Sequence, residues 1–337
     1  MDPVERSIRR SGLFARRRDL LARGLGDRDI RRALGAHRIF RVRHGWYSVP
    51  NAPEAAIRAV RVGGRLTGIS ALESYGLRVP RRERSLVAVP VNACRLRRPS
   101  DRRARRIQSD PVDVLWVDAP REKHGSPWRV SLDDALLSAL EHETRDVAVA
   151  CASAIMRYKR WSRDRLERVF ARAPARCRCW LRLVSGLDDS HGETFVRLWL
   201  LDAGIVMESQ PFIAGVGYLD GRVSPHTYIE VDGAQHDPSW TGETESTYEA
   251  DHDRDRSMAI RGDTVLRFTY RQLYATWSEC LAAVERCIAD DLELVARRAA
   301  GPAPRTLAAV RRKRRTFAAE VARRGNGPPD RRRSPSF

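Results

Sequence analysis

Two β-prone runs that meet at a proline constrain the fold most strongly; they lie in the segment GVGYLDGRVSPHTYIEVDG. Ser224, Pro225 and His226 form the expected turn between two strands. If this hairpin is symmetric about Pro225, Asp220 and Glu230 lie opposite each other, because each is five residues from the centre. Opposed side chains in an antiparallel pair have Cβ atoms about 4.5–5.5 Å apart. The pattern therefore predicts a hairpin that brings two carboxylates together.

Strand alternation adds a third carboxylate to the same face. Glu230 and Asp232 point to one side of their strand, whereas Ile229 and Val231 point to the other. Carboxylates this close repel one another, and oxygen donors of this kind suit Mg²⁺ or Mn²⁺. We therefore predict a metal site formed by Asp220, Glu230 and Asp232. An acidic, exposed hairpin face that holds no ion is the alternative.

Two further residues are candidates for the same site. Ser190 and Glu193 open an apolar run that is typical of a helix ending near Gly204, and Glu193 joins the carboxylates if this helix packs on the sheet. Ser-x-x-Glu is also a capping box, in which the carboxylate accepts a backbone N–H, so a purely structural role stays open. His236 follows Asp232 closely and titrates near neutrality, which suits a general base or a phosphate donor. A structural histidine is the alternative.

The segment that follows the hairpin has a helix, a strand and another helix. Residues 248–260 have helical spacing and carry Asp251, Arg254 and Asp255, and Gly262 is the expected end of that helix. Residues 264–269, TVLRFT, form a β-prone run. Apolar residues from Leu273 to Val295 recur at intervals of three and four, which indicates a long amphipathic helix. The predicted order is helix, strand, strand, helix, strand, helix.

The charge of the chain is unevenly distributed along its 337 residues. Its 62 basic and 43 acidic side chains leave a net charge of +19, which favours a polyanionic partner such as DNA. Residues 1–48 hold 13 basic and 5 acidic side chains, and residues 301–337 hold 11 and 2. Residues 186–275 instead hold 16 acidic and 7 basic side chains. We expect residues 301–337, rich in Arg, Pro and Gly, to be a disordered basic tail.

The first 52 residues have the pattern of two short helices followed by a hairpin. An apolar stripe at Phe14, Leu20 and Leu21 indicates the first helix, and Asp27 is the expected N-cap of the second. β-prone runs at residues 39–43 and 46–49 follow, separated by His44 and Gly45.

This pattern predicts a winged helix-turn-helix that binds DNA. The outward arginines of the second helix would enter the major groove, and those of the wing would reach neighbouring phosphates. The candidate DNA-binding residues are Arg28, Arg31, Arg32, Arg41 and Arg43. A winged module that contacts protein is the alternative.

The same segment resembles the winged-helix module of abortive-infection antitoxins of the AbiEi type over roughly 50 residues. The wing pattern of that family is matched by Arg38, Ile39, Arg41, Val42, Gly45 and Tyr47. The resemblance implies a DNA-binding module and, as a possible partner, a toxin or another protein.

Residues 53–185 form the expected α/β middle region. Helical patterns cover residues 55–62, 68–75, 132–154 and 161–172, and strand patterns cover residues 86–90 and 112–117. The stretch RLRRPSDRRARR from Arg95 to Arg106 is predicted to be an exposed loop. It either adds affinity for phosphates or is simply solvated.

The region from Ser190 onward resembles the PD-(D/E)XK nuclease superfamily, specifically the branch similar to very-short-patch-repair endonucleases. Over about 90 residues the matching blocks are Glu193, Asp220, IEVDG at 229–233, His236, Asp251 with Arg254 and Asp255, and GDTVLRFT from Gly262. This resemblance implies a restriction-endonuclease-like domain over residues 186–300, with a mixed sheet flanked by helices. It also implies Mg²⁺-dependent hydrolysis of DNA phosphodiesters.

One residue departs from the superfamily pattern. Asp232 stands where a lysine is expected two residues after the motif glutamate, and the chain has no lysine between Lys159 and Lys313. Water would then be activated by the metal, by His236 or by Arg254, and an arginine is a poor base. The implied catalytic set is Glu193, Asp220, Glu230, Asp232, His236 and Arg254.

The sequence as a whole predicts a mixed α/β protein with a winged helix, a middle region, a nuclease-like domain and a basic tail. The leading function is a DNA endonuclease, and the alternative is a DNA-binding regulator with an inactive nuclease-like domain. We expect a cytoplasmic protein with no membrane segment, because no apolar run approaches the roughly 20 residues that span a bilayer. Its six cysteines lack the spacing of a zinc site or a disulfide framework.

Overall fold

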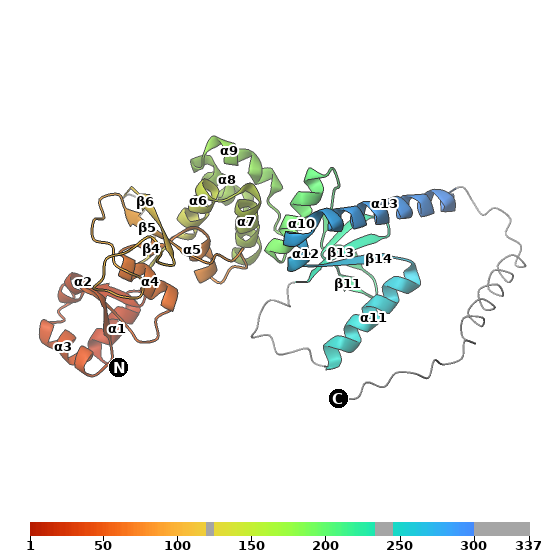
Figure 1. The fold of residues 1–337 in the computed structure, drawn as a ribbon. Coiled ribbons are helices and arrows are strands. Elements are labelled where there is room, and N and C mark those ends of the chain that lie inside the picture. The colour runs from red at the N-terminus through yellow and green to blue at the C-terminus, as the bar shows by residue number, and fades with distance from the viewer. Residues whose placement is uncertain (119–124, 233–244, 300–337) are drawn as a thin grey trace, which may run out of the picture. The chain divides into compact units, whose positions relative to one another are not determined.

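The computed structural model describes residues 1–118, 125–232 and 245–299 (Figure 1). The predicted mixed α/β class is confirmed, because helices alternate with several separate sheets. Backbone packing groups Met1–Ala282 into one unit and assigns Ala283 onward to a second. Among the described residues, no helix has both the length and the apolar character to cross a membrane. His236 and the predicted basic tail lie outside the described residues.

The amino-terminal segment contains three helices and a three-stranded antiparallel sheet in the order β1-β3-β2. The elements are α1 (Pro3–Arg10), β1 (Phe14–Arg16), α2 (Arg17–Leu21), α3 (Asp27–Gly35), β2 (Phe40–Arg43) and β3 (Trp46–Ser48). The placement of Phe14 in a helix was wrong, because Phe14 begins β1 and is buried there. The N-cap of α3 is Gly26 rather than Asp27, and its N–H donates to the Asp29 carboxylate at 3.0 Å.

The middle region has a five-stranded sheet in the order β6-β5-β4-β8-β7, followed by helices. Its elements are α4 (Glu54–Val62), β4 (Arg65–Leu66), α5 (Gly68–Ser74), β5 (Ser85–Pro90), β6 (Val112–Val117), β7 (Gly125–Ser126), β8 (Arg129–Val130), α6 (Leu132–His142), α7 (Arg145–Lys159), α8 (Arg163–Arg172), α9 (Ala175–Arg178) and η2 (Cys179–Leu183). The single helix expected over residues 132–154 is two helices. The chain is extended at Glu143 and Thr144, and Thr144 is the N-cap of α7.

The carboxy-terminal segment contains a four-stranded sheet in the order β14-β13-β12-β9 and a separate β10–β11 hairpin. Its elements are α10 (His191–Asp202), β9 (Glu208–Ser209), β10 (Phe212–Ile213), β11 (Gly217–Tyr218), β12 (Gly221–Ser224), β13 (Thr227–Asp232), α11 (Glu245–Arg261), β14 (Thr264–Thr269), α12 (Tyr270–Ala275) and α13 (Trp277–Ala299). The predicted order of elements is present, with β9, β10 and β11 added between the first helix and the hairpin. Figure 1 shows α10 and α12 on one side of the sheet and α11 on the other.

Helix α10 is anchored to the middle region, and this anchoring positions its first turn. Leu198 belongs to the main hydrophobic core, which includes buried residues from Val4 onward. On the same helix, the Trp199 indole N–H donates to the Asp146 carboxylate of α7 at 2.8 Å. A smaller core beneath the carboxy-terminal sheet consists of Ile213, Leu219, Tyr228 and Met258.

Candidate functional site

The first turn of α10 buries Glu193. The Ser190 hydroxyl caps the helix by accepting the Glu193 N–H at 3.2 Å. The Glu193 carboxylate accepts the N–H of Asp189, one residue before the cap, at 2.9 Å. Its side chain is only 4% exposed. Half of the predicted capping box is therefore present, but the glutamate carboxylate also faces the sheet.

The hairpin places Asp220 beside Glu230, as its symmetry about Pro225 predicts. Gly221 pairs with Ile229 across β12 and β13, so the preceding and following residues come opposite each other. The strands are irregular only near the turn, between Arg222 and Ser224. The Asp220 carboxylate accepts the Val231 N–H at 2.8 Å, which fixes it along the edge of β13.

Gln210 joins the buried carboxylate of Glu193 to the half-buried carboxylate of Asp220. Its side-chain amide donates to Glu193 at 3.0 Å and to Asp220 at 3.4 Å, and its backbone N–H donates to the Asp220 carbonyl at 3.1 Å. Its φ of 54° places it in the left-handed region, which is uncommon for a residue other than glycine. Sequence reasoning missed Gln210, because nothing local marks a glutamine whose partners lie ten and seventeen residues away.

The environment raises the pKa of both acids. Burial, and then the charge of Asp220, raises the pKa of Glu193 to about 7. Burial, together with the charges of Glu230 and Asp189, raises the pKa of Asp220 to about 6, against the lowering effect of the Val231 N–H. Both carboxyls therefore titrate close to neutral pH. A cation held between them would remove the repulsion that contributes to these shifts.

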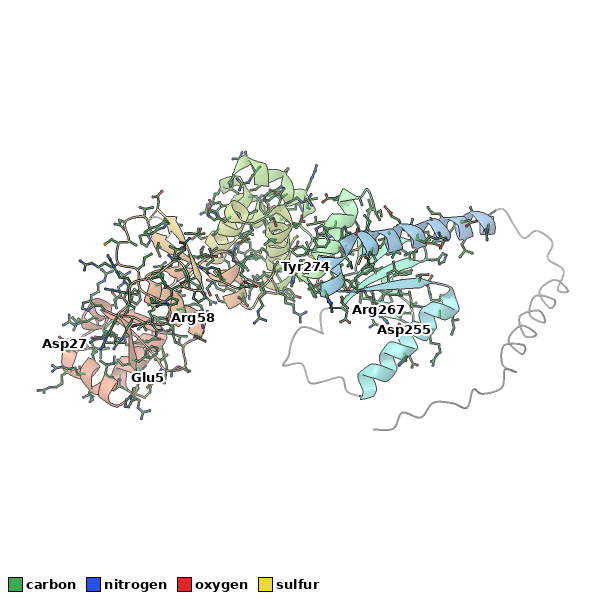
Figure 2. All side chains as sticks on the ribbon, viewed as in Figure 1. Glu5, Asp27, Arg58, Asp255, Arg267 and Tyr274 are labelled. Atoms are coloured by element: carbon green, nitrogen blue, oxygen red, sulfur yellow. The ribbon has the colours of Figure 1, made fainter. Side chains whose placement is uncertain are left out.

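Glu230 is held by an arginine from the neighbouring strand. In the parallel pairing of β13 with β14, Arg267 lies beside Glu230 and donates to its carboxylate at 2.8 Å. The same guanidinium donates to Asp255 of α11 at 3.0 Å, and Figure 2 shows these two side chains side by side. The hydrogen bond from Arg267 is the first cause of the lowered pKa of Asp255. Arg267 thus connects α11 and β14 to the acidic cluster, which consists of Glu193, Asp220, Glu230 and Asp232.

Aromatic side chains line the helix side of this cluster. The His191 ring lies 4.9 Å from the Tyr270 ring, and burial lowers the pKa of His191 to about 4. The Tyr270 hydroxyl accepts the Gly192 N–H at 3.2 Å. Burial is the first cause of the raised pKa of Tyr270, and the charges of Glu193 and Asp220 add to it. The acids therefore lie against a largely apolar wall.

The remaining predicted site residues are placed as follows. Asp232 ends β13 half-buried, opposite Thr269 in the β14 pairing. The Arg254 guanidinium donates to the carbonyls of Val216 at 3.1 Å and Tyr218 at 2.9 Å, so it supports the β10–β11 hairpin. A role for Arg254 in activating water would have to be compatible with these two bonds.

The donor chemistry of the cluster fits Mg²⁺. In proteins, Mg²⁺ is commonly bound by one or two carboxylates and several waters, and Asp220 with its neighbouring acids supplies carboxylates of this kind. Within the described residues, however, no three His, Cys, Asp or Glu side chains converge closely enough to hold a metal ion. The ion pair between Glu230 and Arg267 is one contact that an ion at Glu230 would have to replace.

The predicted basic residues divide into two groups. Arg28, Arg31 and Arg32 are exposed on α3, and Arg41 is exposed on β2. Arg43 is half-buried and donates to the Arg95 carbonyl at 3.2 Å, and its predicted contact with phosphates stays a prediction.

The basic stretch of residues 95–106 is a compact loop beside β2. The bridge between Arg97 and Arg105 closes it, and the Arg98 N–H donates to the Ala104 carbonyl at 3.1 Å. Arg102 donates to the Arg41 carbonyl at 3.4 Å, which joins the loop to β2.

Comparison of the sequence with protein-family models and with curated proteins finds no match in either set.

Proposed function

We propose that this protein is a Mg²⁺-dependent DNA endonuclease that hydrolyses phosphodiesters at the acidic cluster. The observation that carries the proposal is the pairing of buried Glu193 with half-buried Asp220, which a single amide bridges and whose pKa values lie near neutrality. Burial of two adjacent carboxylates costs free energy, because each charge loses solvent and repels the other. Carboxyl groups with strongly raised pKa values are typical of functional sites, and a bound cation would offset the cost of placing these two acids together.

Each residue of the cluster has a distinct part in this proposal. Asp220 and Glu230 would hold the ion, with Asp232 at the end of the same strand and Glu193 beside Asp220. A bound Mg²⁺ would supply an activated water and stabilise charge on the phosphate. Gln210 orients the Glu193 and Asp220 carboxylates through its amide. His191 and Tyr270 pack together beside the first turn of α10, which carries Glu193.

The proposal of DNA binding rests on the amino-terminal segment. Its order of helix, strand, helix, helix, strand, strand supports the predicted winged helix-turn-helix. Of the two consecutive helices α2 and α3, the second carries exposed arginines. The basic loop of residues 95–106 extends the positive surface beside β2. Exposed arginines of this kind bind phosphates irrespective of sequence.

The direct test is cleavage of supercoiled plasmid by the full-length protein with and without Mg²⁺. Nicked or linear DNA should form only with Mg²⁺ and should be lost in Asp220→Asn, which removes a charge from the cluster with little change in shape. Glu208→Gln is the matched control, because Glu208 is an exposed acid on β9 that pairs with Arg222. Cleavage that persists in Asp220→Asn would place catalysis elsewhere and overturn the proposal.

A second candidate is a non-catalytic DNA-binding regulator, with a toxin or another protein as its partner. Two observations favour it: Asp232 replaces the expected lysine, and Arg267 is bonded to the Glu230 carboxylate. Tight DNA binding without Mg²⁺-dependent cleavage in the plasmid assay would support this candidate over the endonuclease.

A further inference from the structure

A pocket of about 270 Å³ lies between the wing hairpin and the sheet of the middle region. Its polar lining comes from Arg16, Arg43, His44, Trp46, Arg65 and Asp118, and valine and alanine side chains complete it. The volume is just below the range of about 300–1,000 Å³ that is usual for ligand sites. The pocket is separate from the acidic cluster, with which it shares no residue.

Arg43 is the partly buried cation of this pocket. One of its guanidinium nitrogens donates to the Arg95 carbonyl at 3.2 Å. Burial first, and then the charges of Arg97 and Arg16, lowers the pKa of Arg43. Positive charges therefore gather around a guanidinium that has already lost solvent. An anion in the pocket would offset both costs.

Two consecutive glycines allow close approaches beside the pocket, Gly63 to the Arg43 guanidinium and Gly64 to β5. A Cβ on Gly63 would lie 2.2 Å from the Arg43 guanidinium, and Gly63 has a φ of +120°, which L side chains rarely adopt. A Cβ on Gly64 would lie 2.1 Å from the Ala88 carbonyl, so only glycine allows this close approach to β5. The chain from α4 to β4 is thus shaped around the guanidinium of Arg43.

The other polar residues of the pocket complete an anion site. The Arg16 guanidinium lies 4.9 Å from the centre of the Trp46 ring, a cation–π contact that orients it. Arg65 is contributed by β4. Among the described residues that line the pocket, Asp118 is the one carboxylate, so arginine charge predominates.

We propose that this pocket binds a phosphate-bearing ligand of about mononucleotide size, with Arg43 and Arg16 as the phosphate ligands. Guanidinium groups match phosphate because their planar N–H donors form paired, charge-assisted hydrogen bonds. The apolar lining and Trp46 provide a surface for a base. A free nucleotide and a nucleotide of bound DNA present the same chemistry. The proposal does not depend on endonuclease activity.

Calorimetric titration of the full-length protein with deoxyadenosine monophosphate and with inorganic phosphate tests the free-ligand source. Arg43→Gln should weaken nucleotide binding about 10- to 100-fold, as expected when one charge-assisted hydrogen-bonded contact is lost. Arg168→Gln is the matched control and should change the affinity less than about twofold, because Arg168 is exposed on α8 and does not line the pocket. If Arg43→Gln fails to fold, Arg65→Gln is the second variant, because it also lines the pocket.

Titration of a short duplex with the same variants tests the DNA source. If free nucleotide does not bind but Arg43→Gln weakens duplex binding more than Arg168→Gln and lowers the salt slope by about one, the phosphate comes from DNA. Either pattern supports the site. Absence of nucleotide binding together with equal effects of the two variants on the duplex would overturn it. Loss of plasmid cleavage alone bears on the proposed function and not on this pocket.

Discussion

At the scale of single residues, the paired acids Glu193 and Asp220 set the character of the site. Each is an ordinary side chain whose pKa is moved by burial and by neighbouring charge. Gln210 lowers the pKa of both acids by donating hydrogen bonds to their carboxylates, which partly offsets the effect of burial. The pair therefore couples protonation to folding.

The raised pKa values predict that the pair destabilises the protein as the pH rises. The folded state binds these protons more tightly than the unfolded chain, so the stabilisation is present below about pH 4 and is lost as the pH rises through about 6 to 7. We expect the free energy of unfolding to fall by on the order of 2 kcal/mol between about pH 5 and about pH 8. Urea denaturation across this range measures it.

Glu193→Gln should flatten that pH dependence, whereas Glu208→Gln should leave it unchanged, because Glu208 is exposed and paired with Arg222. Acids with a lowered pKa, such as Asp255, act in a more acidic range. The lowered pKa of His191 opposes the trend between about pH 4 and about pH 6.5 in both variants, because the unfolded chain binds that proton more tightly. An equal slope in the wild type and Glu193→Gln would show that other groups cause the dependence.

Mg²⁺ binding should strengthen with pH over the same range. Protons on Asp220 and Glu193 must leave before the carboxylates bind a cation, so binding releases protons. We expect at least about a tenfold higher affinity at about pH 8 than at about pH 6. Calorimetry in buffers of different ionisation enthalpy measures both the affinity and the protons released. Affinity that does not change with pH would argue against an ion at these acids.

At the scale of secondary-structure elements, Arg267 connects three of them. It extends from β14 to Glu230 on β13 and to Asp255 on α11. Among residues 252–261 of α11, whose burial the structure describes, Met258 is the buried side chain, and it belongs to the core beneath the sheet.

Arg267→Ala should loosen α11 selectively. Because Arg267 is 46% exposed, we expect a loss of only about 1 kcal/mol in global stability. Amide hydrogen exchange of residues 252–261 should nonetheless become faster, with exchange in α6 unchanged. Arg271→Ala, an exposed arginine on the next helix, is the control. Unchanged exchange in α11 would show that the ion pairs do not hold it.

Helix α3 has one buried face and one exposed basic face. Ile30 faces the core and is 2% exposed, whereas Arg28 is exposed on the same helix. Arg28→Ala should weaken binding of duplex DNA and lower its salt slope by about one without changing the melting temperature. Arg168→Ala on α8 is the exposed control. Fluorescence anisotropy over a range of salt concentrations distinguishes them, and equal losses in both variants would exclude a specific role for α3.

At the scale of the whole molecule, the net charge of +19 opposes compaction. Added salt screens this repulsion, so the melting temperature should rise by a few degrees between about 0.05 M and about 0.5 M NaCl. Affinity for duplex DNA should fall over the same interval, because cations compete for the phosphates. Scanning calorimetry and anisotropy measure the two effects. A melting temperature that falls with salt would show that attractive ion pairs dominate.

Local patterns in the sequence were enough to predict most of the elements. The run TVLRFT is a strand with the predicted bounds, and Gly262, with a φ of +76°, follows α11 as expected. The register of the hairpin followed from symmetry about Pro225, because a short turn leaves few ways to pair its strands. The position of Phe14 in β1 and the break between α6 and α7 were missed, because helix and strand patterns overlap in short apolar runs.

The sequence by itself determined the mixed α/β class, the acidic hairpin and the basic surface of α3, because these depend on residues close together in the chain. Only the tertiary structure decided which side chains meet across elements. Gln210 bonds to Glu193 and Asp220, and Arg267 bonds to Glu230. The Arg43 side chain lines a pocket and lies so close to Gly63 that a Cβ there would crowd it. Such contacts depend on how helices and sheets pack, and the packing follows from the burial of many side chains at once rather than from any local pattern.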